Sequence, residues 1–127
     1  MASDFGKKFS DPRWEAKKRQ VLEKAGYECE FCQIDERLEV HICFFEPGVE
    51  PWDYPDEAYK CYCSEDRLMR RGLESDIRRV MAAFGPNELD SLHSALSQIA
   101  GHSESDRALA MERFYVAAKK VGLEELE

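Results

Sequence analysis

The sequence predicts an α+β fold in which a cysteine knuckle and a short β-hairpin are flanked by helices. Cys29 and Cys32 have the Cys-x-x-Cys spacing of a metal knuckle. Residues 38–45 are rich in β-branched and aromatic side chains, as a strand requires. Apolar side chains then recur at helical spacing through the C-terminal half. We expect residues 1–85 to form the α+β domain and residues 86–127 to form a helical hairpin packed on it.

Composition limits the classes of protein to consider. The chain has 127 residues, of which 43% are hydrophobic, enough for a folded core. It contains no apolar run long enough to span a membrane, so we expect no membrane partner. Residues 1–7 lack the apolar core of a signal peptide, which predicts a cytoplasmic location. Five cysteines in a reducing compartment favour metal binding over disulfides.

The first long helix is predicted from its two ends. Asp11 can accept hydrogen bonds from the free amides of the first turn, and Pro12 suits the first helical position. Gly26 can end the helix in the left-handed conformation. Residues 1–26 carry a net charge of +3, and this helix includes Lys17 and Lys18.

A hairpin is predicted between residues 38 and 62. The first strand covers residues 38–45 and ends at Pro47-Gly48, and the second covers residues 58–62. The prolines between them exclude a helix or a central strand. We therefore expect an ordered loop that is fixed in place by Trp52 and Tyr54.

Three helices are predicted after the hairpin. Ser64 caps the first, which we expect to extend to Phe84 with a buried apolar stripe. Asn87 caps the second, which ends at Gly101, and the third starts at Ser103 or Ser105 and ends near Gly122. The stripe of the first helix consists of Leu73, Ile77, Val80, Met81 and Phe84.

The cysteines predict one structural zinc site. Zinc prefers four thiolate, imidazole or carboxylate ligands in a tetrahedron. Cys29 and Cys32 supply two, and Cys63, at the start of a helix, supplies a third. The fourth ligand is Cys61 or Asp66, which lies one helical turn after Cys63. In the alternative interpretation only the knuckle pair binds, and the other cysteines are packed apolar side chains, as we expect for Cys43.

Several segments together resemble the HNH endonuclease family, in particular its phage and bacterial branch with paired Cys-x-x-Cys knuckles. The resemblance covers roughly residues 5–70. It implies a treble-clef fold of the ββα-metal type, with zinc in the structural site. The segments that carry it are Asp11-Pro12-Arg13-Trp14, residues 26–32, Leu38-Glu39-Val40-His41, and Pro51-Trp52-Asp53-Tyr54-Pro55-Asp56-Glu57.

The chain departs from this family at the active site. The resemblance implies a His-His pair, in which the first His binds the catalytic metal and the second acts as general base, but here the pair is His41-Ile42. The last knuckle cysteine is replaced by Asp66, and the metal-binding His after it by Arg67. His41 is thus the only remnant of the catalytic set. Loss of a general base typically costs about 10²–10⁴ in rate, so we expect no nucleic-acid cleavage.

The function expected is therefore binding without catalysis. The partner is a protein or DNA, as for a small phage effector, and the C-terminal hairpin offers a surface for a homodimer. Net charge is −8 overall and −10 within residues 27–66, but residues 67–84 carry +3. Basic side chains can contact phosphates wherever they cluster. The candidates for nucleic-acid binding are Lys17, Lys18, Arg67, Arg70 and Arg71.

The alternative function is an active, metal-dependent endonuclease with a rearranged site. Hard divalent cations accept carboxylate ligands, so acidic residues of the loop could replace the missing histidines. The carboxylates available are Glu46, Asp53, Asp56 and Glu57. The other two histidines, His93 and His102, lie in the helical hairpin and are expected to be ordinary surface or core residues.

Overall fold

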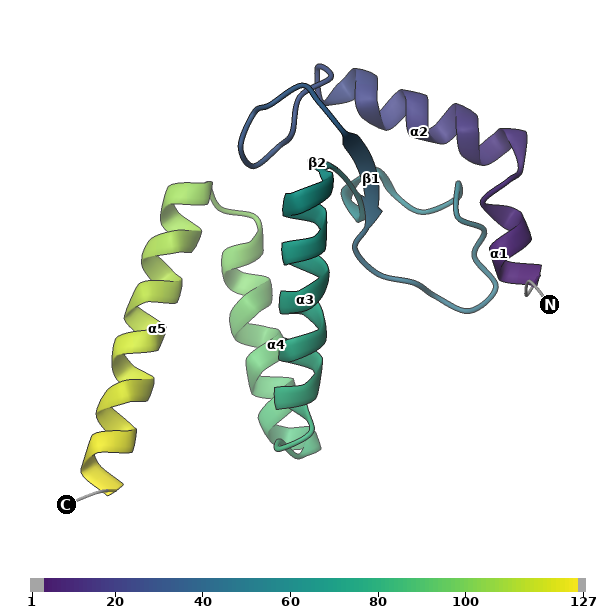
Figure 1. Cartoon of the computed structure of the whole chain (residues 1–127). Helices are drawn as coiled ribbons and strands as arrows, with labels where there is room; N and C mark the ends of the chain where they lie inside the picture. Colours follow the sequence, from purple (N-terminus) through teal and green to yellow (C-terminus); the bar gives the residue numbers. More distant parts are fainter. Residues whose placement is uncertain (1–3, 126–127) are drawn as a thin grey trace. The chain divides into compact units, whose positions relative to one another are not determined.

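The computed structural model describes residues 4–125 and has an α+β architecture (Figure 1). No helix in that range has the length and hydropathy needed to cross a membrane. Residue contacts divide the chain into two compact units, Met1–Ile77 and Arg78–Glu127, and each is described separately below. In chain order the elements are α1 (Asp4–Lys8), α2 (Pro12–Lys24), β1 (Leu38–Ile42), the 3₁₀ helix η1 (Asp56–Ala58), β2 (Tyr59–Cys63), α3 (Ser64–Met81), α4 (Pro86–Ala100) and α5 (Glu104–Glu125).

Helix α2 begins and ends as predicted. The Asp11 carboxylate accepts a hydrogen bond from the backbone N–H of Arg13 at 2.8 Å, with Pro12 in the first turn. Gly26 follows the helix with a φ of 69°, a conformation that glycine adopts without strain. The short helix α1, which the sequence did not predict, precedes this cap.

Strands β1 and β2 form a two-stranded antiparallel sheet. Val40 pairs with Cys61 and Leu38 with Cys63, so the hairpin carries the cysteines of β2 beside the apolar side chains of β1. β1 is shorter than predicted because Phe44 and Phe45 leave the ladder and pack edge-on against Tyr54. β2 is shifted by one residue from its predicted range and extends to Cys63.

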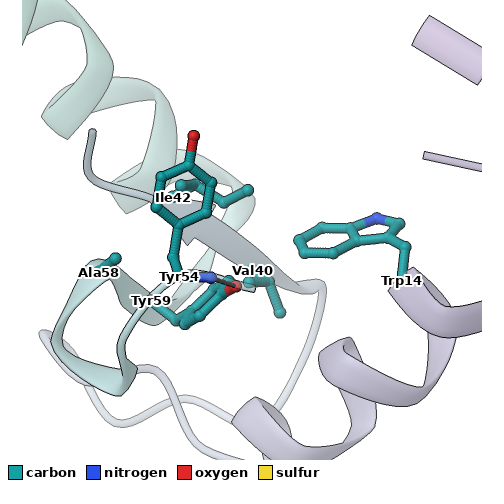
Figure 2. Packing of buried hydrophobic residues seen from close by; sticks show 6 residues of the cluster. All are labelled: Trp14, Val40, Ile42, Tyr54, Ala58 and Tyr59. Atoms are coloured by element: carbon teal, nitrogen blue, oxygen red, sulfur yellow. Dashed lines mark hydrogen bonds between the residues drawn. The ribbon is translucent and has the colours of Figure 1, made fainter. Parts of the chain in front are cut away.

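The core of this unit lies between the hairpin and α2. Trp14 points from α2 toward the hairpin, where Val40 and Ile42 are buried with it (Figure 2). The loop between the strands closes this core as predicted: the Tyr54 backbone N–H donates to the Tyr59 hydroxyl at 3.1 Å, and that hydroxyl donates to the Pro51 carbonyl. Trp52 packs against the same cluster.

Helix α3 begins directly at the end of β2 and packs on the other face of the hairpin through polar side chains. Side chains alternate along a strand, so Glu39 and His41 face away from Val40 and Ile42. Arg67 on α3 donates to the Glu39 carboxylate at 3.5 Å, and Glu74 hydrogen-bonds His41 at 2.6 Å. The structure therefore has a ββα order with an apolar and a polar face to the hairpin.

The prediction that α3 has a buried apolar stripe is wrong. All five predicted stripe residues are exposed, and Leu73 and Ile77 keep more than half of their surface in solvent. Within the first unit, α3 meets the hairpin through the polar side chains of Arg67 and Glu74, which leaves Leu73 and Ile77 in solvent. The helix also ends at Met81, three residues before the predicted end.

In the second unit, α4 and α5 contact each other as a helical hairpin. Gly85, rather than the predicted Asn87, occupies the N-cap of α4, and its N–H donates to the Glu88 carboxylate at 3.1 Å. Ser103 caps α5 by accepting a hydrogen bond from the Asp106 N–H, one of the two starts predicted. Packing of this hairpin on the first unit stays a prediction.

Candidate metal centre

The knuckle is a tight turn that points backbone amides at a sulfur. The N–H groups of Phe31 and Cys32 donate to Cys29 Sγ at 3.4 and 3.5 Å. Tyr27 and Gln33 have positive φ values of 57° and 66°, which let the chain reverse on both sides of this turn. Hydrogen bonds of this kind stabilise a thiolate, the form of cysteine that binds metal.

The second half of the centre forms where β2 becomes α3. Cys63 is the last residue of β2, and Asp66 lies in the first turn of the helix that follows. The Asp66 backbone N–H donates to Cys63 Sγ at 3.5 Å. The strand end thus delivers the thiol, and the first helical turn places the carboxylate next to it.

Four side chains from these two segments converge. Cys29 Sγ donates to Asp66 Oδ2 at 3.1 Å, and Cys32 Sγ lies 3.8 Å from Cys63 Sγ. One potential ligand atom from each of the four lies within 4.8 Å of the others. A tetrahedral ion with metal–sulfur bonds of about 2.3 Å holds two sulfurs about 3.8 Å apart. These four residues therefore lie close enough to hold a metal ion.

Cys61 lies outside this group of four. Its side chain is fully buried in β2, where burial raises the pKa of its thiol to about 11. Glu30 holds the backbone of Cys61: the Glu30 N–H donates to the Cys61 carbonyl at 2.8 Å, and the Cys61 N–H donates to the Glu30 carboxylate. Of the two candidates for the fourth ligand, the structure brings Asp66 to the centre.

Hydrogen bonds within the centre shift the pKa values of its thiols and of its carboxyl group. Burial raises the pKa of Cys29, but N–H groups of Cys32, Cys63 and Phe31 outweigh it and lower the pKa overall. The Ile34 amide lowers the pKa of Cys32, but the Asp66 carboxylate, burial and the other thiols together raise it to about 12. The same thiols hold the pKa of Asp66 below its usual value.

Metal binding is therefore expected to release at least one proton near neutral pH. The Cys32 thiol stays protonated without an ion and must lose its proton to become a ligand. Affinity should rise with pH, by about tenfold per pH unit for each proton released. Titration calorimetry in two buffers with different ionisation heats measures that number directly. An affinity that does not change between pH 6 and about 8 would contradict this centre.

A second group of potential ligands lies on the polar face of the hairpin. His41, Cys43 and Glu74 each place one donor atom within 4.8 Å of the others. Glu74 also accepts a hydrogen bond from Arg70 Nε at 2.8 Å. Burial raises the pKa of Glu74, but its hydrogen bonds to Arg70 and His41 outweigh this and lower it below its ordinary value of 4.5. The hydrogen bonds of Glu74 to Arg70 and His41 therefore contribute their full stability above about pH 4.5. This contribution is lost as the pH falls through the lowered pKa of Glu74.

Sequence reasoning found His41 but missed its partners. Glu74 lies 33 residues away and meets His41 only because α3 packs on the hairpin. Cys43 was assigned to packing, although its position two residues after His41 on a strand was a usable signal. The structure places none of the loop carboxylates of the alternative function in either ligand group among residues 4–125. Asp56, for example, forms ion pairs with Lys17 and Lys24.

A cleft of about 640 Å³ lies beside the hairpin, between α2 and α3. Four basic residues line it, together with Glu15, Glu39 and His41. Arg67 reaches Glu39 there, and its Nε is buried without a hydrogen-bond partner. The basic residues of the cleft are Lys18 and Arg19 from α2 and Arg67 and Arg71 from α3.

Two of the five predicted nucleic-acid contacts lie elsewhere. Lys17 pairs with Asp56 at 3.4 Å and lines a different cleft. Arg70 donates to Glu74 and to the Tyr62 hydroxyl, which joins the polar face of the hairpin to α3. The structure thus brings Lys18, Arg67 and Arg71 together and leaves Lys17 and Arg70 outside.

Comparison with known proteins identifies no relative of this chain. No protein-family model matches the chain, and neither the curated proteins nor the solved structures contain a significant match.

Proposed function

We propose that this protein is a zinc-stabilised, HNH-like treble-clef module that binds the nucleic-acid backbone without cutting it. The observation that carries the proposal is the cleft between α2 and α3, where basic side chains from both helices flank a hairpin whose only histidine is buried. The proposal has three parts: a structural zinc ion, the loss of the residues that would cleave nucleic acid, and the binding of a phosphate backbone.

Zinc is the ion that best fits the centre. Zinc is a borderline-soft ion that accepts both soft thiolates and a hard carboxylate, whereas magnesium does not bind a set of three sulfurs. The ion would be held by Cys29, Cys32, Cys63 and Asp66 and would join the knuckle to the start of α3. A closed four-ligand set of this kind is typical of structural rather than catalytic zinc.

The position of the missing general base is part of the core. Ile42 is 7% exposed and packs with Trp14 on the apolar face of the hairpin. His41 is 4% exposed and is engaged by Glu74. A general base must come within hydrogen-bond reach of the proton that it abstracts. These contacts favour a protein that keeps the HNH-like hairpin but does not cleave nucleic acid.

The cleft offers what a phosphate backbone requires. Phosphate contacts need only cationic or N–H donors and carry no sequence information. Arg71 is exposed and lines the same cleft as Arg67 and Lys18. Because the whole chain carries −8, this local cluster, rather than net charge, must attract the polyanion.

Fluorescence anisotropy with a labelled DNA duplex tests this function. We expect binding without sequence preference that weakens steeply between about 50 and 200 mM salt, with a slope corresponding to two to four phosphate contacts. A single-stranded probe and an RNA duplex of the same length identify the preferred form. No binding at the lowest salt concentration, by zinc-loaded and folded protein, would contradict the proposal.

A protein partner is the second candidate, and one surface favours it. A groove of about 290 Å³ beside the metal centre is lined by Phe31 of the knuckle and by Met69, Leu73 and Ile77 of α3. Exposed apolar patches of this kind often mark protein contacts. Light scattering over a wide range of protein concentration tests the simplest partner, a second copy. A concentration-dependent dimer that Leu73→Glu returns to monomer would support this candidate, and a monomer throughout would count against it.

A further inference from the structure

The polar face of the hairpin carries a second set of metal donors that shares no residue with the first. His41 lies on β1, Cys43 follows that strand, and Glu74 lies on α3. His41 Nε2 is 2.6 Å from Glu74 Oε1, and one potential ligand atom of each residue lies within 4.8 Å of the other two. All three belong to the unit Met1–Ile77.

These donors are held in place by the fold. Residues two apart on an extended chain project to the same side, which sets His41 and Cys43 together. The Cys43 backbone N–H donates to the Ala58 carbonyl at 2.7 Å, and this hydrogen bond fixes Cys43 next to the start of β2. The side chain of His41 is 4% exposed and that of Glu74 is 27% exposed, and Cys43 is half-buried, so the set lies at the edge of the buried part of the unit.

We propose that His41 Nε2, Cys43 Sγ and Glu74 bind a second divalent transition ion of the zinc class, which joins β1 to α3. Nitrogen, sulfur and oxygen donors from one residue each suit zinc or cobalt(II) and disfavour magnesium or calcium. Cys43 and Glu74 correspond to no position of the HNH motif, so the ligand set is particular to this chain. Three protein ligands leave the fourth tetrahedral position to a water molecule.

Arg70 sets the order in which the two sites fill. Its guanidinium donates to the Glu74 oxygen that His41 also contacts, so an ion must compete with a neighbouring positive charge. The first centre offers three thiols and a carboxylate, so it should fill first.

Cobalt(II) titration of the metal-free full chain, read by absorption and by elemental analysis after gel filtration, tests the inference. We expect two equivalents, the second weaker and with a weaker sulfur-to-cobalt band. Cys43→Ser should lose the second equivalent only, and Glu74→Gln gives the same readout if the serine variant does not fold. Arg70→Gln should tighten the second equivalent.

Cys61→Ser is the matched control, because Cys61 is buried but belongs to neither ligand set, and it should keep both equivalents. One equivalent in the unmodified chain would overturn the proposal. Retention of two equivalents by both Cys43→Ser and Glu74→Gln would also overturn it. His41 also lines the basic cleft, but the cobalt equivalents are counted in the absence of nucleic acid, so failure of this inference and failure of the proposed function are distinguishable.

Discussion

Replacement of Cys63 with alanine is expected to release the ion of the first centre and to unfold the unit around it. Zinc binding contributes about 10–16 kcal/mol in small zinc domains, which is comparable to the entire stability of a typical domain, about 5–15 kcal/mol. In this chain the ion would tie the knuckle to the junction of β2 and α3, in addition to the Glu30–Cys61 hydrogen bonds and the packing of Cys29 with Tyr62 and Cys63. Circular dichroism and zinc content before and after the change measure the effect.

Two variants make this test specific to the centre. Cys61→Ala makes the same chemical change at a fully buried cysteine outside the ligand group, and it should cost only about 0.5–3 kcal/mol and keep the ion. Asp66→Cys supplies a fourth thiolate at the same helical turn and should keep the ion as well. Loss of zinc from Cys61→Ala with retention in Cys63→Ala would reverse the assignment of the ligands.

The second large effect is expected on nucleic-acid affinity. The double variant Arg67→Gln/Arg71→Gln removes two charges from the cleft, and each charged hydrogen bond to a phosphate contributes about 1.5–3 kcal/mol. Affinity should therefore fall by at least about 100-fold, and the salt dependence should fall by about two contacts. Anisotropy titrations at several salt concentrations measure both quantities.

The matched control for the cleft lies on the same helix. Arg78→Gln/Arg79→Gln removes the same charge from the last turn of α3, and neither residue is among those that line the cleft. This pair should change affinity and salt slope little. Equal losses of affinity in the two double variants would mean that binding depends on net charge, and would contradict a role for the cleft.

Local signals predicted much of the fold. The Asp11-Pro12 start and the Gly26 stop of α2 depend on backbone chemistry within a few residues, so the sequence alone defines them. The hairpin and the start of α3 at Ser64 follow from similar short-range patterns. The stripe on α3 was assigned wrongly because periodicity tells which residues share a face, but not which face meets the hairpin. Here the ion pairs of Arg67 and Glu74 decide that choice.

The two groups of potential metal ligands also differ in how far the sequence could predict them. The sequence predicted three ligands, Cys29, Cys32 and Cys63, because the spacing of metal-binding cysteines is a local pattern. The choice between Cys61 and Asp66 for the fourth ligand depends on where β2 ends. The cluster around His41 could not be predicted, because Glu74 reaches it only across the helix–hairpin contact. Helix packing also separates Arg70 from Arg71, neighbours in sequence that serve different faces.

The central claim, binding without cleavage, is tested most directly by incubation of supercoiled plasmid with the zinc-loaded protein and magnesium, manganese, nickel or zinc. One agarose gel then reports both retardation and nicking. We expect retarded plasmid that salt releases, and no open-circular product with any ion. Open-circular product that depends on a metal and disappears in His41→Ala would contradict the account and establish an active endonuclease.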